Sequence, residues 1–350
     1  MCAMKILYGV QTTGYGHIVR SREMITRLKA RGHHVTALLS GAEPKKGWAT
    51  EVFEPYIQKK GLTFITDRGR LKHFKTMAQL NFPRFFSDVY RLDLSGYDLV
   101  ISDYEPITAN AARLKGVPSI GIGHLYAFRY RVPVAWHNPL AVMVMKYFAT
   151  VSYPLGLHWH HFNQPLLPPT IADNVKVEPG SDEKKIVVYL PNEKIEDIRA
   201  AVESFGGYRF YIYWHFREKG EEGNMCFRPF SRDGFVRDLC DCGGVICGGG
   251  FSLISEALHL GKKVLSKPIR GQAEQESNAR ALEKLEKGMV MRDLNSRKIS
   301  RWLKQSPIEP MNYPPVLAEV IEWIASGDWA DISGLSRKLW QRRKRVVHLN

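Results

Sequence analysis

A chain of 350 residues is too long for one ordinary hydrophobic core, so two domains of roughly 150 to 180 residues with a cleft between them are expected. Hydrophobic residues make up 44% of the sequence and charged residues 24%, which excludes a disordered chain, a collagen-like repeat and a small disulfide-stapled protein. The net charge of +15 indicates a surface that attracts anions, whether nucleotides, nucleic acid or acidic lipid headgroups.

The first half of the chain alternates apolar strands with helices. A strand is predicted at residues 5–10, followed by a glycine-containing loop and a helix that ends at Gly32. Further strands are predicted at 34–39, 62–65, 98–102 and 119–122. This alternation is typical of a parallel sheet covered by helices on both faces.

The pattern stops at residues 166–180, where three prolines and little periodicity indicate a linker, and then starts again. Strands are predicted at 209–214, 244–247 and 263–265, with helices at 251–260 and 272–286. This is a second doubly wound unit. The predicted organisation is a domain at 1–165, a linker at 166–182, a domain at 183–326 and a basic helix at 327–350.

A short glycine motif, Gly14-Tyr15-Gly16-His17, lies between the first strand and the first helix. Glycines there let the backbone approach a ligand, and the start of the helix offers unpaired N–H groups with a partial positive charge. The motif is therefore interpreted as an anion or substrate platform. His17 has a side chain suited to proton transfer at neutral pH, and a helix-capping histidine is the structural alternative.

A second, stronger motif at residues 248–257 directly follows an apolar strand. Its three glycines leave the backbone bare where a helix begins, so successive N–H groups can hold a diphosphate, and Ser252 adds a hydroxyl. Glu256 lies about one turn into that helix and can accept hydrogen bonds from two ribose hydroxyls. The structural alternative is a tight turn with Glu256 as a solvated surface acid.

A third motif, PIRGQAEQESNA at residues 268–279, follows the next predicted strand. Its amides and acids, Glu274 and Gln275 among them, present donors and acceptors that suit the hydroxyls of a sugar ring without a metal. Arg270 is a candidate for stabilising a leaving diphosphate. Spaced by one strand, the second and third motifs together predict a nucleotide-sugar site.

The segments GYGHIVRS, GGGFSLISEAL and PIRGQAEQESNA resemble those of GT-B glycosyltransferases, especially the branch of the N-acetylglucosaminyltransferase of peptidoglycan synthesis. Their order and spacing match across nearly the whole chain. Within that superfamily the chain is similar to a group of little-characterised bacterial and archaeal glycosyltransferases that also carry a segment like VISDYEP, here at 100–106. The resemblance implies an α/β fold of two Rossmann-like domains facing a cleft, with the donor in the C-terminal domain and the acceptor in the N-terminal domain.

The resemblance also implies roles for single residues. It places the donor diphosphate at Gly249, Gly250, Phe251 and Ser252, the ribose at Glu256, the sugar hydroxyls near Glu274 and Gln275, and the acceptor loop at Gly14 and Gly16. The expected donor is a UDP-sugar, used as a substrate, with no cofactor. Relatives often have a glutamine pair where this chain has Glu274 followed by Gln275, so specificity for N-acetylglucosamine is not transferred.

An inverting transfer needs a base for the acceptor hydroxyl and stabilisation of the leaving diphosphate. His17 is the expected base, and the start of the helix at Gly250 to Ser252 stabilises the leaving group. Asp103 and Glu105 follow a predicted strand, at the sheet edge where α/β proteins place ligand-binding residues. Either acid can orient His17 or act as the base itself, and helix capping by Asp103 is the structural alternative.

No essential metal is expected. The acid pair Asp103 and Glu105 is weak support for a metal site in this fold, and the cysteines do not form paired CxxC spacing. Histidines at 158, 160 and 161 lie on an aromatic, apolar stretch, where packing is the better interpretation. Cysteine usage and a first segment too short to span a membrane predict a cytoplasmic protein.

The acceptor is expected to be a glycan or a lipid-linked molecule of the cell envelope. An apolar segment at 139–157 and the basic C-terminal helix can dock the enzyme on an anionic membrane surface, and a core helix with a solvated tail is the alternative. Nucleic acid is an unlikely partner, because no stacking-aromatic motif accompanies the basic tail.

Three other functions are considered. A nucleotide-sugar epimerase or hydrolase of the same fold, and a non-catalytic nucleotide-sugar-binding or membrane-surface scaffold, both stay open. A dinucleotide-dependent oxidoreductase requires a Gly-x-Gly-x-x-Gly loop and an acid after the second strand, where this chain has Val19 and Ser40.

Overall fold

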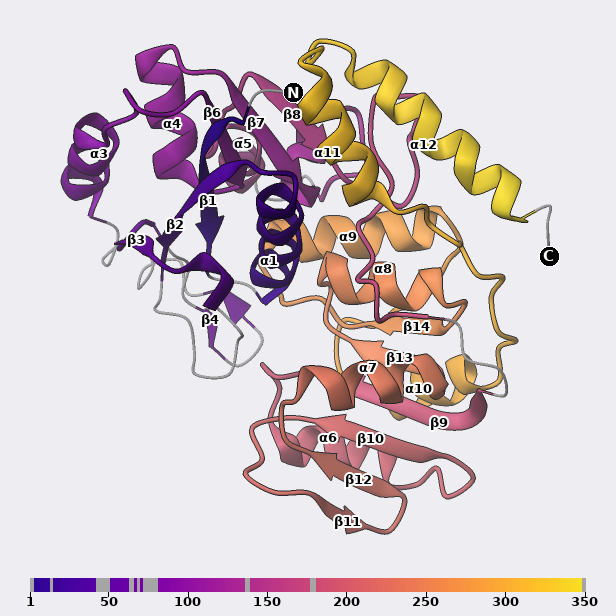
Figure 1. Ribbon diagram of the computed structural model, residues 1–350. Coiled ribbons are helices and arrows are strands. Elements are labelled where there is room, and N and C mark those ends of the chain that lie inside the picture. Colours follow the sequence, from indigo (N-terminus) through magenta and orange to yellow (C-terminus); the bar gives the residue numbers. More distant parts are fainter. Residues whose placement is uncertain are drawn as a thin grey trace.

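The computed structural model describes residues 3–12, 15–41, 51–62, 66–67, 70–71, 81–135, 139–176 and 181–347 (Figure 1). They form two α/β units, each built around one mainly parallel sheet. The predicted fold class, two doubly wound Rossmann-like units, is therefore confirmed. No helix in the described parts of the chain is long and apolar enough to cross a membrane.

The first unit has a six-stranded parallel sheet with the order β3-β2-β1-β6-β7-β8. Its strands are β1 (Lys5–Gln11), β2 (His34–Ser40), β3 (Tyr56–Lys59), β6 (Leu99–Asp103), β7 (Ser119–Gly123) and β8 (Tyr153–Gly156). The inner strands β6 and β7 are buried along their whole length, which is why their sequences are continuous apolar runs. Strands β3 and β8 were not predicted because they are short and carry half-exposed residues. The strand expected at 62–65 cannot be compared, since residues 63–65 lie outside the described part.

Helices cover both faces of the first sheet. The bounds are α1 (Tyr15–Ala30), α3 (Phe82–Arg91), α4 (Pro106–Lys115) and α5 (Pro139–Tyr147). Apolar residues of α1 pack in one core cluster with one face of the sheet, while those of α3 and α4 pack in another with the opposite face. Short 3-10 helices at Glu51–Phe53 and His124–Arg129 and a small hairpin of β4 (Thr66–Asp67) and β5 (Arg70–Leu71) complete this unit.

The second unit has a seven-stranded sheet with the order β11-β12-β10-β9-β13-β14-β15, in which the pair β11 and β12 is antiparallel. The strands are β9 (Asp182–Tyr189), β10 (Arg209–Tyr213), β11 (Gly220–Glu222), β12 (Met225–Arg228), β13 (Cys242–Cys247), β14 (Lys263–Ser266) and β15 (Met289–Val290). The helices are α6 (Ile195–Val202), α7 (Arg232–Asp241), α8 (Phe251–His259), α9 (Ala273–Lys284) and α10 (Ser296–Leu303). The predicted strands and helices match, while the hairpin of β11 and β12 was not predicted.

The last two helices, α11 (Val316–Ser326) and α12 (Ile332–Val347), return to the first unit (Figure 1). Helix α11 contacts α1, and Arg31 forms an ion pair with Glu322. Ser336 and Trp340 of α12 both donate hydrogen bonds to the carbonyl oxygen of Leu166, at 2.7 and 2.8 Å. Helix α11, expected in the second domain, therefore packs on the first.

Candidate active site

The candidate site lies where the carboxyl ends of the two sheets face each other. The first glycine motif follows β1 and the second follows β13, so both open toward the space between the units. A Cβ placed on Gly16 would lie 2.5 Å from Oγ of Ser252, so the two motifs nearly touch and a larger residue at position 16 would displace the Ser252 hydroxyl. Gly14, the other glycine expected in the acceptor loop, lies outside the described residues.

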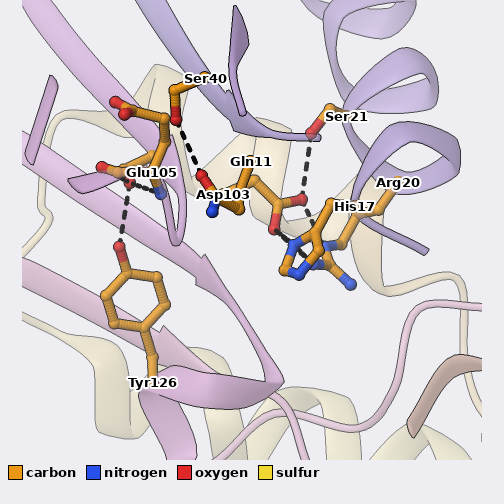
Figure 2. Close-up of polar contacts among 9 residues, drawn as sticks. Gln11, His17, Arg20, Ser21, Ser40, Asp103, Glu105 and Tyr126 are labelled. Carbon is orange, nitrogen blue, oxygen red and sulfur yellow. Dashed lines mark hydrogen bonds and ion pairs between the residues drawn. The ribbon is translucent and has the colours of Figure 1, made fainter. Parts of the chain in front are cut away.

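His17, at the start of α1, is held by a buried carboxylate (Figure 2). Its Nδ1 lies 2.7 Å from Oδ1 of Asp103, which is fully buried at the end of β6. A carboxylate oxygen can only accept a hydrogen bond, so Nδ1 of the neutral imidazole is the donor and carries the proton. The other ring nitrogen, Nε2, then presents a lone pair. The His17 side chain stays 21% exposed. The arrangement is that of an oriented general base.

Arg20 and Ser21, also on α1, complete the surroundings of Asp103 (Figure 2). Arg20 donates through Nε to Oδ2 at 2.8 Å and through Nη2 to Oδ1, and Ser21 Oγ donates to Oδ2 at 3.1 Å. Burial opposes ionisation of Asp103, but the charges and hydrogen bonds of Arg20 and His17 outweigh it and hold the pKa of Asp103 below its usual range. Asp103 is therefore an anion that orients His17, and not the base itself.

Glu105 has a structural role instead of the expected catalytic one. Its Oε1 accepts from the N–H of Ile107 at 2.8 Å, and its Oε2 accepts from the N–H and the hydroxyl of Thr108 at 2.6 and 2.7 Å. These bonds cap the first turn of α4. The catalytic prediction for Glu105 is wrong, and the cap that was considered for Asp103 is made by Glu105, two residues later.

The start of α8 is open, as expected for a diphosphate site. Gly250 is the N-cap residue, no side chain caps the helix, and a Cβ on Gly250 would meet no atom within 4 Å. The first N–H groups of a helix have no partner within it and carry a partial positive charge. The backbone of Phe251 and the partly exposed Ser252 begin this helix. These groups can bind an anion in the space between the units.

Gly249 and Gln275 differ from the prediction because they bind each other. The N–H of Gly249 donates to Oε1 of Gln275 at 2.9 Å, and that oxygen also accepts from the N–H of Ile269 at 3.0 Å. The carbonyl oxygen of Gly249 accepts from Asn278 at 2.9 Å. Gly249 therefore does not offer its N–H to a diphosphate. The side-chain oxygen of Gln275 fixes the loop and does not bind a sugar hydroxyl.

The ring of Phe251 joins the two units and does not contact the open site. It stacks on His124 with centroids 3.9 Å apart and on Trp159 at 5.3 Å. Trp159 also donates to Ser255 Oγ at 2.8 Å, and Nε2 of His124 lies 2.5 Å from the side-chain oxygen of Asn278. Burial lowers the pKa of His124 to about 4. Only the backbone of Phe251 is left for the predicted donor contact.

Glu256 is buried and paired, so it is not the solvated acid of the structural alternative. Its two carboxylate oxygens contact Arg232, at the start of α7, at 2.6 and 3.2 Å. From the sequence, both oxygens are predicted to accept hydrogen bonds from ribose hydroxyls. A ribose at this position would share the carboxylate with Arg232 or displace it.

Arg270 precedes α9, and Glu274 lies in its first turn. Arg270 is half exposed and pairs with Asp293 at 2.5 Å, so its guanidinium is directed to a surface acid. The Glu274 side chain is partly exposed. Burial raises the pKa of Glu274, and the nearby charges of His17 and Arg20 oppose that rise. Glu274 of the second unit is therefore close enough to His17 and Arg20 of the first unit to interact with their charges.

The sequence profile of the family described as glycosyl transferase family 1 matches residues 4–307. The chain belongs to this family. It is thus a glycosyltransferase that takes its sugar from a nucleotide donor. None of the curated proteins matches this glycosyltransferase in sequence.

Solved structures of the same fold cover nearly all of the glycosyltransferase. The glycosyltransferase of kitacinnamycin is 17% identical with a TM-score of 0.58, covering 98% of this chain and 100% of its own. VinC in complex with DTDP is 16% identical with a TM-score of 0.54, with the same coverage. MurG of Acinetobacter baumannii is 13% identical with a TM-score of 0.52, covering 92% of this chain and 99% of its own. These likenesses confirm the GT-B fold.

Histidines outside the site have packing roles in the glycosyltransferase. His158 is buried, its Nδ1 accepts from the N–H of Trp159 at 2.8 Å, and burial lowers its pKa. The rings of His160 and His161 stack on each other. The Nδ1 atom of each accepts a hydrogen bond from the backbone N–H two residues later. Within the described ranges, no group of three or more His, Cys, Asp or Glu side chains could hold a metal ion.

The close approach of Gly16 to Ser252 makes a prediction about how the two units fit. In Gly16→Ala the new methyl clashes with Ser252 Oγ, so the Ser252 hydroxyl must rotate away or the units must separate slightly, and kcat/KM is expected to fall about tenfold. Ser252→Gly removes the opposing atoms. Steady-state kinetics of both single variants and the double variant measure the coupling, expected at about 0.5 to 3 kcal/mol. Additive effects in the double variant would contradict this contact.

Proposed function

We propose that the enzyme transfers a sugar from a nucleoside diphosphate donor, UDP-sugar in the first instance, to an acceptor hydroxyl with inversion and without a metal. The observation that carries this proposal is the hydrogen bond of 2.7 Å between His17 and Asp103. It leaves Nε2 of His17 as a proton acceptor, and the neighbouring Gly16 lies against Ser252 at the open start of α8. A base on one side and an anion site on the other match a single displacement.

The steps follow from these positions. The acceptor hydroxyl gives its proton to Nε2 of His17 as its oxygen forms a bond to the anomeric carbon. The bond from that carbon to the diphosphate oxygen breaks on the opposite face, and the electron pair leaves with the nucleoside diphosphate. One displacement inverts the anomeric centre. Asp103 stabilises the imidazolium that forms, as an oriented carboxylate does next to a catalytic histidine.

The donor is proposed to bind the second unit. The N–H groups at the start of α8 and the hydroxyl of Ser252 hold the diphosphate, and Glu274 accepts hydrogen bonds from the sugar. Phe230 extends a half-exposed ring beside Tyr189 and His215, where β9, β10 and β12 end, and can stack on the nucleobase. The solved VinC complex with DTDP supports a nucleoside diphosphate in this fold.

The acceptor is proposed to bind the first unit, next to His17 and Gly16. We propose a glycan or a lipid-linked molecule of the cell envelope as acceptor, and a location in the cytoplasm or on the cytoplasmic face of the membrane. The net charge of +15 supports contact with anionic lipid.

The first test is thermal stabilisation of the full chain by UDP, TDP, GDP and ADP, each with and without EDTA. A ligand that binds only the folded state at about 100 times its Kd stabilises by about 2.7 kcal/mol. One nucleotide is expected to raise Tm equally with and without EDTA. Stabilisation by none of them, or only with added metal, would contradict the donor site. With the matching nucleotide sugar, release of free sugar in the absence of acceptor would identify a hydrolase.

A further inference from the structure

Exposed large apolar side chains gather on three helices of the first unit. Within the described part of the chain, most of the large hydrophobic residues with high exposure lie on α3, α4 and α5. They are Phe82, Phe86, Tyr90, Leu114, Met143 and Tyr147. Together they form a surface that we call the α3–α5 face.

Helix α3 shows the arrangement most clearly. Phe82, Phe86 and Tyr90 follow each other at intervals of four residues, so they form one stripe, and they are 42%, 62% and 74% exposed. Phe85 and Val89, on the other side of the helix, are buried in the core. The helix therefore has one apolar face in the core and a second one directed to solvent, which a helix in water does not need for folding.

The three helices are neighbours on one side of the sheet. Phe85 and Val89 of α3 pack in the same core cluster as Ile107 of α4. Asn110 of α4 donates to the carbonyl oxygen of Phe148, directly after α5, at 3.1 Å. Figure 1 shows α3 and α4 on the outer side of the first unit, away from the second. The exposed residues thus lie on neighbouring helices of the first unit.

This surface is basic as well as apolar. Arg84 and Arg91 on α3 and Arg113 on α4 are exposed. The sequences of α3, α4 and α5 contain one acid, Asp88, which pairs with Lys59 at 2.8 Å and lies 4.0 Å from Arg84. Aromatic side chains flanked by arginines are complementary to the interface of an anionic bilayer, where rings enter the headgroup region and guanidinium groups meet phosphates.

The basic C-terminal helix, expected from the sequence to dock on a membrane, is already engaged with protein. Leu339 and Trp340 of α12 are buried. Lys338 and Arg342 both pair with Glu319 of α11, and Arg343 donates to a backbone carbonyl oxygen. Its apolar side therefore packs on the first unit and is not available to lipid. Of the expected apolar segment at 139–157, Met143 and Tyr147 remain exposed.

We propose that the α3–α5 face docks the enzyme on an anionic lipid bilayer. The proposal rests on the proposed function, because a lipid-linked acceptor must be presented near the membrane. Val142 and Met145 of α5 pack against Ala273, next to Glu274, so the buried side of α5 reaches the edge of the site. An acceptor headgroup can then enter the site while its lipid stays in the bilayer.

The test is flotation of the full chain with vesicles of phosphatidylcholine and phosphatidylglycerol in equal parts, and with phosphatidylcholine alone. Binding is expected for the anionic vesicles only, weakening as salt is raised. The double variant Phe86→Ser/Tyr90→Ser should lower the partition coefficient by on the order of tenfold. Arg84→Gln/Arg91→Gln should lower it about fivefold for each charge removed.

Matched variants make the outcome specific. Tyr56→Ser removes an exposed tyrosine from the edge strand β3 and should bind like the parent chain. Loss of binding in Arg337→Gln/Arg342→Gln but not in the α3 variants would overturn the proposal in favour of the C-terminal helix. A dimer of the parent chain that the α3 variants dissociate, with vesicle binding unchanged, would overturn it in favour of self-association.

Nucleotide stabilisation, measured without vesicles, separates this proposal from the enzymatic one. The α3 variants change exposed residues far from the donor site, so they should keep the Tm shift of the parent chain. Vesicle binding without any nucleotide-induced shift would reject the donor site and keep the docking face. A nucleotide-induced Tm shift without vesicle binding would keep the donor site and reject the docking face.

Discussion

His17→Ala is expected to lower kcat by about 10²- to 10⁴-fold, because it removes the only proton acceptor that the proposed mechanism uses for the acceptor hydroxyl. The Tm shift caused by the nucleotide should be unchanged, since the start of α8 and Ser252 lie in the other unit. Single-turnover kinetics with saturating donor and acceptor measure the chemical step separately from binding.

A second histidine provides the control for this variant. His34 is exposed at the start of β2, away from the site, and His34→Ala should keep full activity. If His17→Ala kept activity within a few fold of the parent enzyme, His17 would not be the base. Loss of the nucleotide-induced Tm shift in His17→Ala would instead assign His17 to donor binding.

Sequence periodicity predicted most of the fold because most buried strands of both sheets are continuous apolar runs, and those strands dominate each core. It failed where burial is one-sided or a strand is short, as in β3, β8 and the hairpin of β11 and β12. It also placed α11 with the second unit, since nothing local to Val316–Ser326 indicates that its apolar side packs on α1.

The positions of candidate residues were predicted where these positions depend on the backbone or on the place of a motif in the fold. Gly250, the start of α8 and His17 lie as expected, because strand-to-helix turns at the carboxyl edge of a parallel sheet fix where they point. Residues whose role depends on a side-chain partner were missed or misassigned. Gly249 and Gln275 bind each other, Phe251 stacks on two rings, and Arg270 pairs with a surface acid.

Arg20 could have been found from the sequence, since it lies one helical turn after His17 and therefore on the same side of α1. The spacing of Asp103 and Glu105 misled for a related reason. The two acids are two residues apart, and only Glu105 directly precedes the proline at the start of α4. Glu105 therefore caps the helix. Because the two acids are close in sequence, both were predicted at the site. The local backbone instead directs Asp103 to His17 and Glu105 to the first turn of α4.

Asp103→Ala is expected to lower the free energy of unfolding by about 3 to 5 kcal/mol, because it leaves the buried guanidinium of Arg20 without its anion. The pKa of Asp103 is depressed in the folded state, so its stabilisation is present above the ordinary carboxyl pKa of about 4 and is lost as pH falls through the lower, folded value. Urea unfolding at neutral and acidic pH measures both effects.

The double variant Asp103→Ala/Arg20→Met distinguishes loss of a partner from loss of packing. Removing both charges of a buried pair costs far less than removing one, so the double variant should be more stable than Asp103→Ala alone. Its activity should stay low, because His17 no longer has a carboxylate to hold Nδ1. A double variant that recovered activity together with stability would mean that Asp103 supports the fold and does not position the base.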